Sequence, residues 1–161
     1  DNHKQDLVNS GAKLIHECDV SEENNGTFVA PAAYEIQNIS ELDQEYFGPI
    51  LHVIRYKAKD RQKTLEQINS TGFGLTFGLH SRIQSDFEKT FANVHAGNAY
   101  VNRNMIGAIV GCQPFGGEGL SGTGPKAGGP NYLYRFCTER VLSIDTTAQG
   151  GNATLIATAE D

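Results

Sequence analysis

The sequence lacks the features that mark several large classes of protein. It has no apolar stretch near the roughly 20 residues that a membrane helix requires, so we predict no membrane span. Its formal charge is −6, and its nearest basic cluster, at residues 57–63, is interrupted by Asp60. This balance argues against nucleic acid as a partner. It has only three cysteines, none at CxxC or metal-finger spacing, so we expect no metal site.

The remaining composition is that of an ordinary globular domain. The chain has 161 residues, of which 39% are hydrophobic and 20% charged, which fits one domain with a real core. An odd number of cysteines in an acidic chain favours reduced thiols, so we expect a cytoplasmic location. The chain opens inside a helical pattern without a capping residue and closes on a loosely patterned polar tail. We therefore expect a fragment of a larger protein.

Helical and strand patterns alternate along most of the chain. Helical patterns cover residues 4–11, 60–70, 85–94 and 131–136. Strand patterns cover residues 13–18, 27–36, 51–57, 75–81, 96–103 and 138–146, with Pro31 interrupting the second. Gly11 and Gly72 are expected to end helices, and Asp60 and Ser85 to cap them. Such alternation predicts an α/β fold with parallel strands.

A glycine-rich segment at residues 100–130 is the most informative part of the sequence. It holds nine glycines between Asn104 and Pro130, interleaved with large apolar side chains. A flexible linker is the alternative interpretation, but linkers consist mostly of Gly and Ser. We therefore predict a folded loop whose backbone N–H groups contact a small ligand.

This segment also matches the G-x-G-x-x-G/A pattern twice, at residues 117–122 and 122–127. A dinucleotide fingerprint must follow a strand and open a helix. Here the preceding residues are CQPFG, and Pro125 would break the required helix. We therefore do not expect a phosphate site at either match.

A second motif, EYFGP at residues 45–49, combines a carboxylate with a rigid Gly-Pro turn before a predicted strand. Glu45 could accept hydrogen bonds from sugar hydroxyls, as acidic residues do in nucleotide sites. Taken alone, the motif favours the other interpretation, a solvent-exposed glutamate at a helix end.

Three motifs in order carry a family resemblance: E-x-FGP at 45–49, G-N-x-Y-V-N at 97–102 and QPFGGEGLSG at 113–122. In this combination the chain resembles the C-terminal part of the aldehyde dehydrogenase superfamily over roughly residues 24–149. Within it, the similarity is greatest to the Δ1-pyrroline-5-carboxylate dehydrogenase module of the bifunctional bacterial proline utilization enzymes, and next to the stand-alone Δ1-pyrroline-5-carboxylate dehydrogenases. The resemblance implies an α/β fold with this organisation: the C-terminal part of the catalytic domain at 1–118, a glycine-rich loop and short helix at 119–136, an oligomerisation strand at 137–149 and a tail at 150–161.

The resemblance also implies a function and a set of site residues. The function is oxidation of L-glutamate γ-semialdehyde to L-glutamate in proline catabolism, with NAD as cofactor. FAD is implied only if a proline dehydrogenase module shares the polypeptide. Glu45 corresponds to the glutamate that binds the nicotinamide-side ribose, and Phe47 to the aromatic residue beside the nicotinamide. Gly107 and Ala108 correspond to the loop that holds the substrate carboxylate through backbone N–H groups, and Phe115 to the aromatic that packs on the substrate's aliphatic stem.

Two departures from the family pattern matter. The family's usual anchor serine stands as Ala108, so one side-chain bond to the carboxylate is missing. The nucleophilic cysteine and the general-base glutamate lie upstream of the region that aligns, so we expect no catalytic residue here and no activity from this segment alone. Cys112 is an alternative nucleophile, but we expect it to pack as a small residue. His52 and His80 are expected to be ordinary packed or surface histidines.

Three other functions stay open at this stage. The chain could belong to a different aldehyde dehydrogenase. It could be a non-catalytic module that uses the loop to capture an anionic metabolite. It could also be an assembly element, because the strand at residues 139–146 is expected to pair with a second copy in a homo-oligomer.

Overall fold

Short helices and strands alternate in the computed structural model, which describes residues 2–20, 26–109 and 111–145. The α-helices are α1 (Asn2–Asn9), α2 (Arg61–Ser70) and α3 (Gln84–Phe91). The 3-10 turns are η1 (Ile39–Glu41), η2 (Ala58–Asp60) and η3 (Leu133–Phe136). The strands are β1 (Lys13–Glu17), β2 (Ala32–Glu35), β3 (Ile50–Val53), β4 (Phe73–Gly74), β5 (Thr76–Leu79), β6 (Asn98–Val101) and β7 (Glu118–Gly119).

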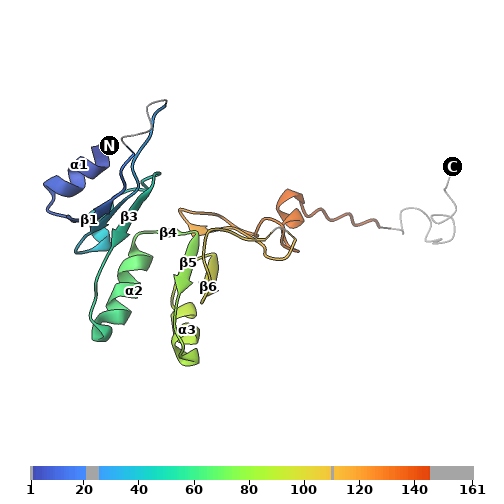
Figure 1. Cartoon of the computed structure of the whole chain (residues 1–161). Helices are drawn as coiled ribbons and strands as arrows, with labels where there is room; N and C mark the ends of the chain where they lie inside the picture. Colours follow the sequence, from blue (N-terminus) through green and yellow to red (C-terminus); the bar gives the residue numbers. More distant parts are fainter. Residues whose placement is uncertain (1, 21–25, 110, 146–161) are drawn as a thin grey trace.

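The strands form three small sheets, with orders β1-β2-β3, β4-β7 and β5-β6 (Figure 1). The β2–β3 and β5–β6 pairs are parallel, which confirms an α/β fold. The expectation of parallel pairing is wrong for β1, which runs antiparallel to β2. No helical pattern separates these two strands in the sequence, and antiparallel neighbours need no helical crossover.

The core of the N-terminal part lies between α1 and the three-stranded sheet. Leu7 of α1 is buried against Ala32 and Tyr34 of β2 and against Ile36 beyond it. Gly11 ends the helix as predicted, with a φ of 88°. This left-handed conformation turns the chain back so that the Ala12 N–H donates to the Leu7 carbonyl at 2.9 Å. The chain therefore passes from α1 to β1 within a short turn, and the buried side chain of Leu7 stays packed against the sheet.

An ion pair connects α2 with α3. Arg61 at the start of α2 lies 2.8 Å from the Asp86 carboxylate and donates to the Thr90 hydroxyl at 2.6 Å. The Arg61 guanidinium lowers the pKa of the Asp86 carboxyl below its ordinary value. Thr90 is buried, so this network supplies hydrogen bonds that a polar group needs away from water.

The predicted caps of these helices have different outcomes. Asp60 does occupy the position before α2, although its side chain makes no capping bond. The prediction of Ser85 as a cap is wrong, because α3 begins at Gln84. Ser81 supplies the local bond instead, since its hydroxyl accepts the Ile83 N–H at 3.1 Å. A serine hydroxyl can close this turn from two residues upstream, which the cap pattern does not anticipate.

The glycine-rich segment is a folded loop, as predicted, and one side chain of β6 holds it. The Asn98 carboxamide accepts the Gly116 N–H at 3.0 Å and donates to the Pro114 carbonyl at 2.9 Å. The Leu120 N–H then donates to the Gly72 carbonyl, beside the β4–β7 pair. The stretch after β7 has no helix before η3 in the described residues, which agrees with rejecting the dinucleotide fingerprint.

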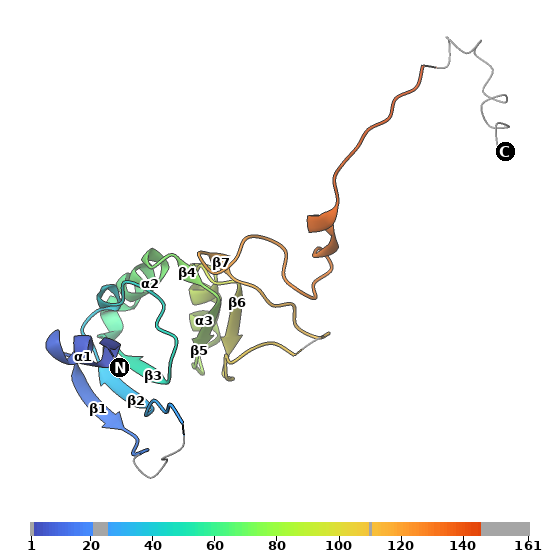
Figure 2. The same ribbon diagram turned by 90° about the horizontal axis from the view of Figure 1, so that it is seen from above.

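The last described part of the chain runs away from the helices and sheets after η3 (Figure 2). The helical expectation at 131–136 agrees with η3. The predicted strand at 138–146 has no strand partner over its described residues, 138–145, so its pairing stays a prediction; Thr146 and the predicted tail lie outside the described residues. None of the helices within the described ranges is long and apolar enough to span a membrane.

We expect Gly97→Ala to lower the free energy of unfolding by about 1–3 kcal/mol, measured by urea denaturation. A Cβ at this position would collide with the Gly116 carbonyl oxygen, which is backbone and cannot rotate away. Gly48→Ala is the matched control, because a Cβ there meets no atom within 4 Å of the described chain. Equal unfolding free energies for the two variants would show that the loop does not approach β6 so closely.

Candidate functional site

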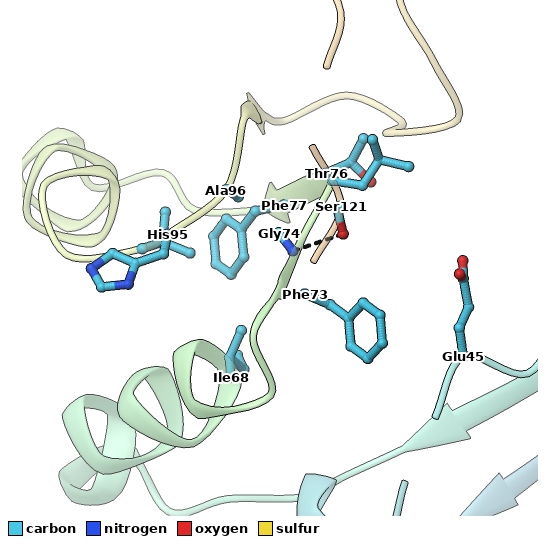
Figure 3. A pocket seen from close by; sticks show the side chains of 11 residues that line it. Glu45, Ile68, Phe73, Gly74, Thr76, Phe77, His95, Ala96 and Ser121 are labelled. Carbon is cyan, nitrogen blue, oxygen red and sulfur yellow. Dashed lines mark hydrogen bonds between the residues drawn. The ribbon is translucent and has the colours of Figure 1, made fainter. Parts of the chain in front are cut away.

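The first candidate pocket contains Glu45 and has a volume of about 320 Å³. Phe73, Thr76 and Phe77 line it from β4 and β5, and Ser121 lines it from the glycine-rich segment. The Ser121 hydroxyl accepts the Gly74 N–H at 3.0 Å, which fixes that wall (Figure 3). We call this cavity the Glu45 pocket.

Its polar side chains are few, and the carboxylate and the imidazole among them stand on opposite sides. Figure 3 shows Glu45 at the side opposite His95, with the aromatic rings of Phe73 and Phe77 between them. A carboxylate accepts hydrogen bonds only, and a hydroxyl such as that of Thr76 both donates and accepts. The pocket therefore combines apolar walls with acceptors suited to a ligand that carries hydroxyl groups.

The residue after Glu45 holds its loop in place. The Tyr46 ring stacks on the His3 ring of α1, with ring centroids 3.4 Å apart and planes inclined by 12°. The Tyr46 hydroxyl donates to the Asp43 carboxylate at 2.6 Å, and this bond raises the pKa of the phenol above its ordinary value. The position of Glu45 thus depends on α1, which is distant in the sequence.

A histidine pair continues this cluster to β3. The Nε2 atoms of His3 and His52 are 2.8 Å apart, so one ring donates and the other accepts. Two protonated rings could not make this bond. Burial lowers the pKa of both histidines from the ordinary value of 6.5, and Asp6 and Asp43 offset part of the effect at His3. His52 is therefore a packed histidine, as expected from the sequence.

Phe47 does not lie in the Glu45 pocket. Its side chain is 93% exposed, and it is not among the residues that line that cavity. The structure thus separates the two residues predicted to bind the cofactor, although they are two positions apart in the sequence. The Gly48-Pro49 turn that follows leads directly into β3, as the motif predicts.

The second candidate pocket lies within the glycine-rich segment and also has a volume of about 320 Å³. It brings together Ala108 and Phe115, two of the three residues predicted to contact the substrate. Its lining residues are Ala108, Gly111, Gln113, Phe115, Ala127 and Gly128. We call this cavity the loop pocket.

Backbone pairing shapes the loop pocket. Phe115 and Ala127 exchange two backbone hydrogen bonds, at 3.0 and 2.9 Å, so the two sides of the segment face each other. A turn closes the other end, where the Gln113 N–H donates to the Ile109 carbonyl at 3.0 Å. Gln113 was not predicted as a site residue, although its place at the start of the QPFGG motif could have suggested it.

Gly107 is half-buried at the edge of this arrangement and does not line the loop pocket. Cys112 does not line it either, and its thiol is exposed, so the expectation that Cys112 packs inside the loop is wrong. Its N–H donates to the Ile109 carbonyl in the turn at 3.1 Å, so its backbone takes part in the turn while its thiol stays exposed. His80 is exposed, in agreement with a surface histidine.

The aldehyde dehydrogenase family profile matches residues 1–142. The chain belongs to the aldehyde dehydrogenase family. The resemblance predicted from the E-x-FGP and QPFGGEGLSG motifs is thereby confirmed. A bifunctional protein PutA from Salmonella typhimurium is 56% identical over 122 residues, which cover 76% of this chain and 9% of that protein. The chain thus spans about a tenth of that relative's length.

Solved structures of family members agree with the fold. A variant of proline utilization A from Bradyrhizobium japonicum superposes with a TM-score of 0.80 at 49% identity, covering 91% of this chain and 15% of that one. A 1-pyrroline-5-carboxylate dehydrogenase from Thermus with bound NAD superposes with a TM-score of 0.72 at 38% identity, covering 83% of this chain and 26% of that one. The aldehyde dehydrogenase fold of the described residues is therefore shared with enzymes of proline catabolism.

We expect the free energy of unfolding to fall as the pH drops below about 6.5. The lowered pKa values mean that the unfolded chain takes up protons on His3 and His52 before the folded chain does, so acid favours unfolding. Thermal unfolding midpoints at several pH values between 5 and 7.5 would measure this. His52→Gln should flatten the dependence, whereas His80→Gln, at an exposed position, should leave it unchanged. An equally steep dependence in His52→Gln would contradict the assignment.

Proposed function

We propose that this chain is the C-terminal part of an NAD-dependent dehydrogenase that oxidises L-glutamate γ-semialdehyde to L-glutamate. The observation that carries the proposal is the loop pocket, in which Ala108 and Phe115 from separate positions line one cavity. The backbone N–H groups at Gly107 and Ala108 would hold the substrate carboxylate, and the Phe115 ring would pack on its aliphatic stem. The similarity to PutA and to 1-pyrroline-5-carboxylate dehydrogenase supports this substrate.

The chemistry of the Glu45 pocket fits the cofactor. NAD carries ribose hydroxyls, which donate to carboxylates, and Glu45 supplies such an acceptor at one side of a cavity with mostly apolar walls. Glu45 would hold the ribose, and Phe47, exposed beside it in the sequence, would lie against the nicotinamide. When bound, NAD supplies the hydride acceptor for aldehyde oxidation.

The exposed surface supports assignment to a larger enzyme. Large apolar side chains are exposed to solvent, and Phe47 and Ile106 are 93% and 91% exposed. We propose that the remaining catalytic domain covers this surface and supplies the nucleophilic cysteine. A cytoplasmic location follows from this assignment.

We expect Glu45→Gln in the complete dehydrogenase to raise the KM for NAD roughly 10- to 100-fold, because a hydrogen bond to a charged group is worth about 1.5–3 kcal/mol. Steady-state kinetics with pyrroline-5-carboxylate would measure it. Glu66→Gln, an exposed position on α2, is the control for the lost charge. An unchanged KM for NAD in Glu45→Gln would remove Glu45 from the cofactor site.

The chain on its own should form no NADH from NAD and pyrroline-5-carboxylate. Turnover by the isolated chain that Cys112→Ser abolishes would overturn the proposal and make Cys112 the nucleophile. Unaided binding of glutamate by the isolated chain, seen by calorimetry, would instead favour a non-catalytic module.

We also propose that residues 139–146 pair with a second copy of the chain by strand addition. The described part of this segment has no strand partner within the chain, and its apolar side chains, such as Val141 and Leu142, are exposed. Backbone donors and acceptors along such a segment can pair with a strand of a neighbouring chain. The complete dehydrogenase would therefore be a homo-oligomer.

We expect Leu142→Pro to shift the complete dehydrogenase toward monomer, because proline removes a ladder N–H and disrupts an intermolecular strand. Light scattering coupled to gel filtration would report the molar mass. Leu142→Thr retains the N–H and the preference for strands, so it should remain oligomeric. An oligomer that survives Leu142→Pro would place the interface elsewhere.

A further inference from the structure

Gln113 stands out among the residues of the loop pocket. Of the six described residues that line this cavity, it is the one with a polar side chain; the others are alanine, glycine and phenylalanine. Ligand pockets are mostly apolar and fix their ligand with a few placed polar groups. In this cavity, Gln113 is therefore the side chain that can direct a polar ligand.

The hydrogen bonds of the turn determine which way the carboxamide points. The Ile109 N–H donates to Oε1 of Gln113 at 3.3 Å, while the Gln113 N–H donates to the Ile109 carbonyl at 3.0 Å. Because the oxygen faces the Ile109 N–H, the other head of the carboxamide is the amino group. Nε2 has no acceptor among the described residues, so two N–H donors are available on a residue that lines the cavity.

The neighbouring position creates a need for such a donor. Ala108 lines the same cavity, and its side chain cannot donate a hydrogen bond. No lysine or arginine is among the described residues that line this cavity, so this chain offers an anionic ligand there neutral donors. A carboxylate has about four lone-pair sites and can accept bonds from backbone N–H groups and from a side chain together.

We propose that Gln113 is a further substrate-binding residue, whose Nε2 donates to the carboxylate that the Gly107–Ala108 backbone holds. This inference rests on the proposed function, because it takes the loop pocket as the carboxylate site. Gln113 thereby determines specificity for aldehydes that carry a carboxylate. Its oxygen has a separate structural role, which is to hold the turn through Ile109.

Two variants of the complete dehydrogenase, Gln113→Glu and Gln113→Met, distinguish the role of the carboxamide oxygen from that of the amino group. Glutamate retains an oxygen for the Ile109 N–H but replaces the amino donor with a negatively charged oxygen. Methionine has a similar volume but neither the oxygen nor the amino group. We expect kcat/KM for glutamate semialdehyde to fall roughly 10- to 100-fold in both variants, mostly through KM. With butanal, which has no carboxylate, kcat/KM should change less than about threefold in Gln113→Glu.

Gln5→Glu, an exposed position on α1, controls for the added charge and should behave as the unmodified enzyme. Equal losses with both aldehydes would show that Gln113 only shapes the loop, and no loss with either would exclude a contact; both results overturn the inference. The unmodified enzyme is assayed first with both aldehydes. A higher kcat/KM with butanal than with glutamate semialdehyde would contradict the proposed function itself.

Discussion

The contact between Asn98 and the glycine-rich segment is the constraint on which the rest of the second half depends. The Asn98 carboxamide bonds to both the Pro114 carbonyl and the Gly116 N–H. It can do so because Gly97 has no side chain that would keep the Gly116 carbonyl away from β6. From that fixed point the chain proceeds to the pairing of Phe115 with Ala127 and to β7. The loop pocket is thus built on a strand, not on a free loop, which gives its walls a defined spacing.

The two candidate pockets are supported by different parts of the structure. The Glu45 pocket joins a loop, held by His3 and Tyr46, to the β4–β5 wall, while the loop pocket lies wholly within the glycine-rich segment. A dehydrogenase needs a cofactor and a substrate side by side, and each support supplies one of them under the proposed function. Under that proposal, the rest of the catalytic domain would cover exposed apolar side chains such as Phe47 and Ile106.

The sequence predicted the elements well where local chemistry determines them. Gly11 and Gly72 end their helices with positive φ, and the β5–β6 pair follows from helix–strand alternation. The glycine-rich segment was correctly predicted to fold, but burial of its apolar residues is not the reason, because Ile106, Ile109 and Leu120 are exposed. Hydrogen bonds to Asn98 and the pairing of Phe115 with Ala127 hold it instead. The direction of β1 was missed, because pairing direction depends on the connection and not on the strand's own residues.

The candidate site was predictable to a lesser extent, for a related reason. Motifs identified Ala108 and Phe115, but the role of Gln113 depends on a bond to Ile109 that only the folded turn creates. Likewise, nothing in EYFGP indicates that Tyr46 stacks on His3, because the two residues belong to separate elements. Cys112 was expected to pack, yet the turn uses its backbone and leaves the sulfur outside. Contacts between distant segments were invisible to pattern analysis.

The β4–β7 ladder has a consequence for biosynthesis. Phe73 and Gly74 pair with residues that follow much later in the chain, Gly119 and Glu118. During translation, β4 therefore emerges from the ribosome well before its partner and remains an open edge until the glycine-rich stretch has been made. Because β4 is only two residues long, this edge offers few backbone groups to another chain during that interval. A longer strand at this place would invite nascent chains to associate.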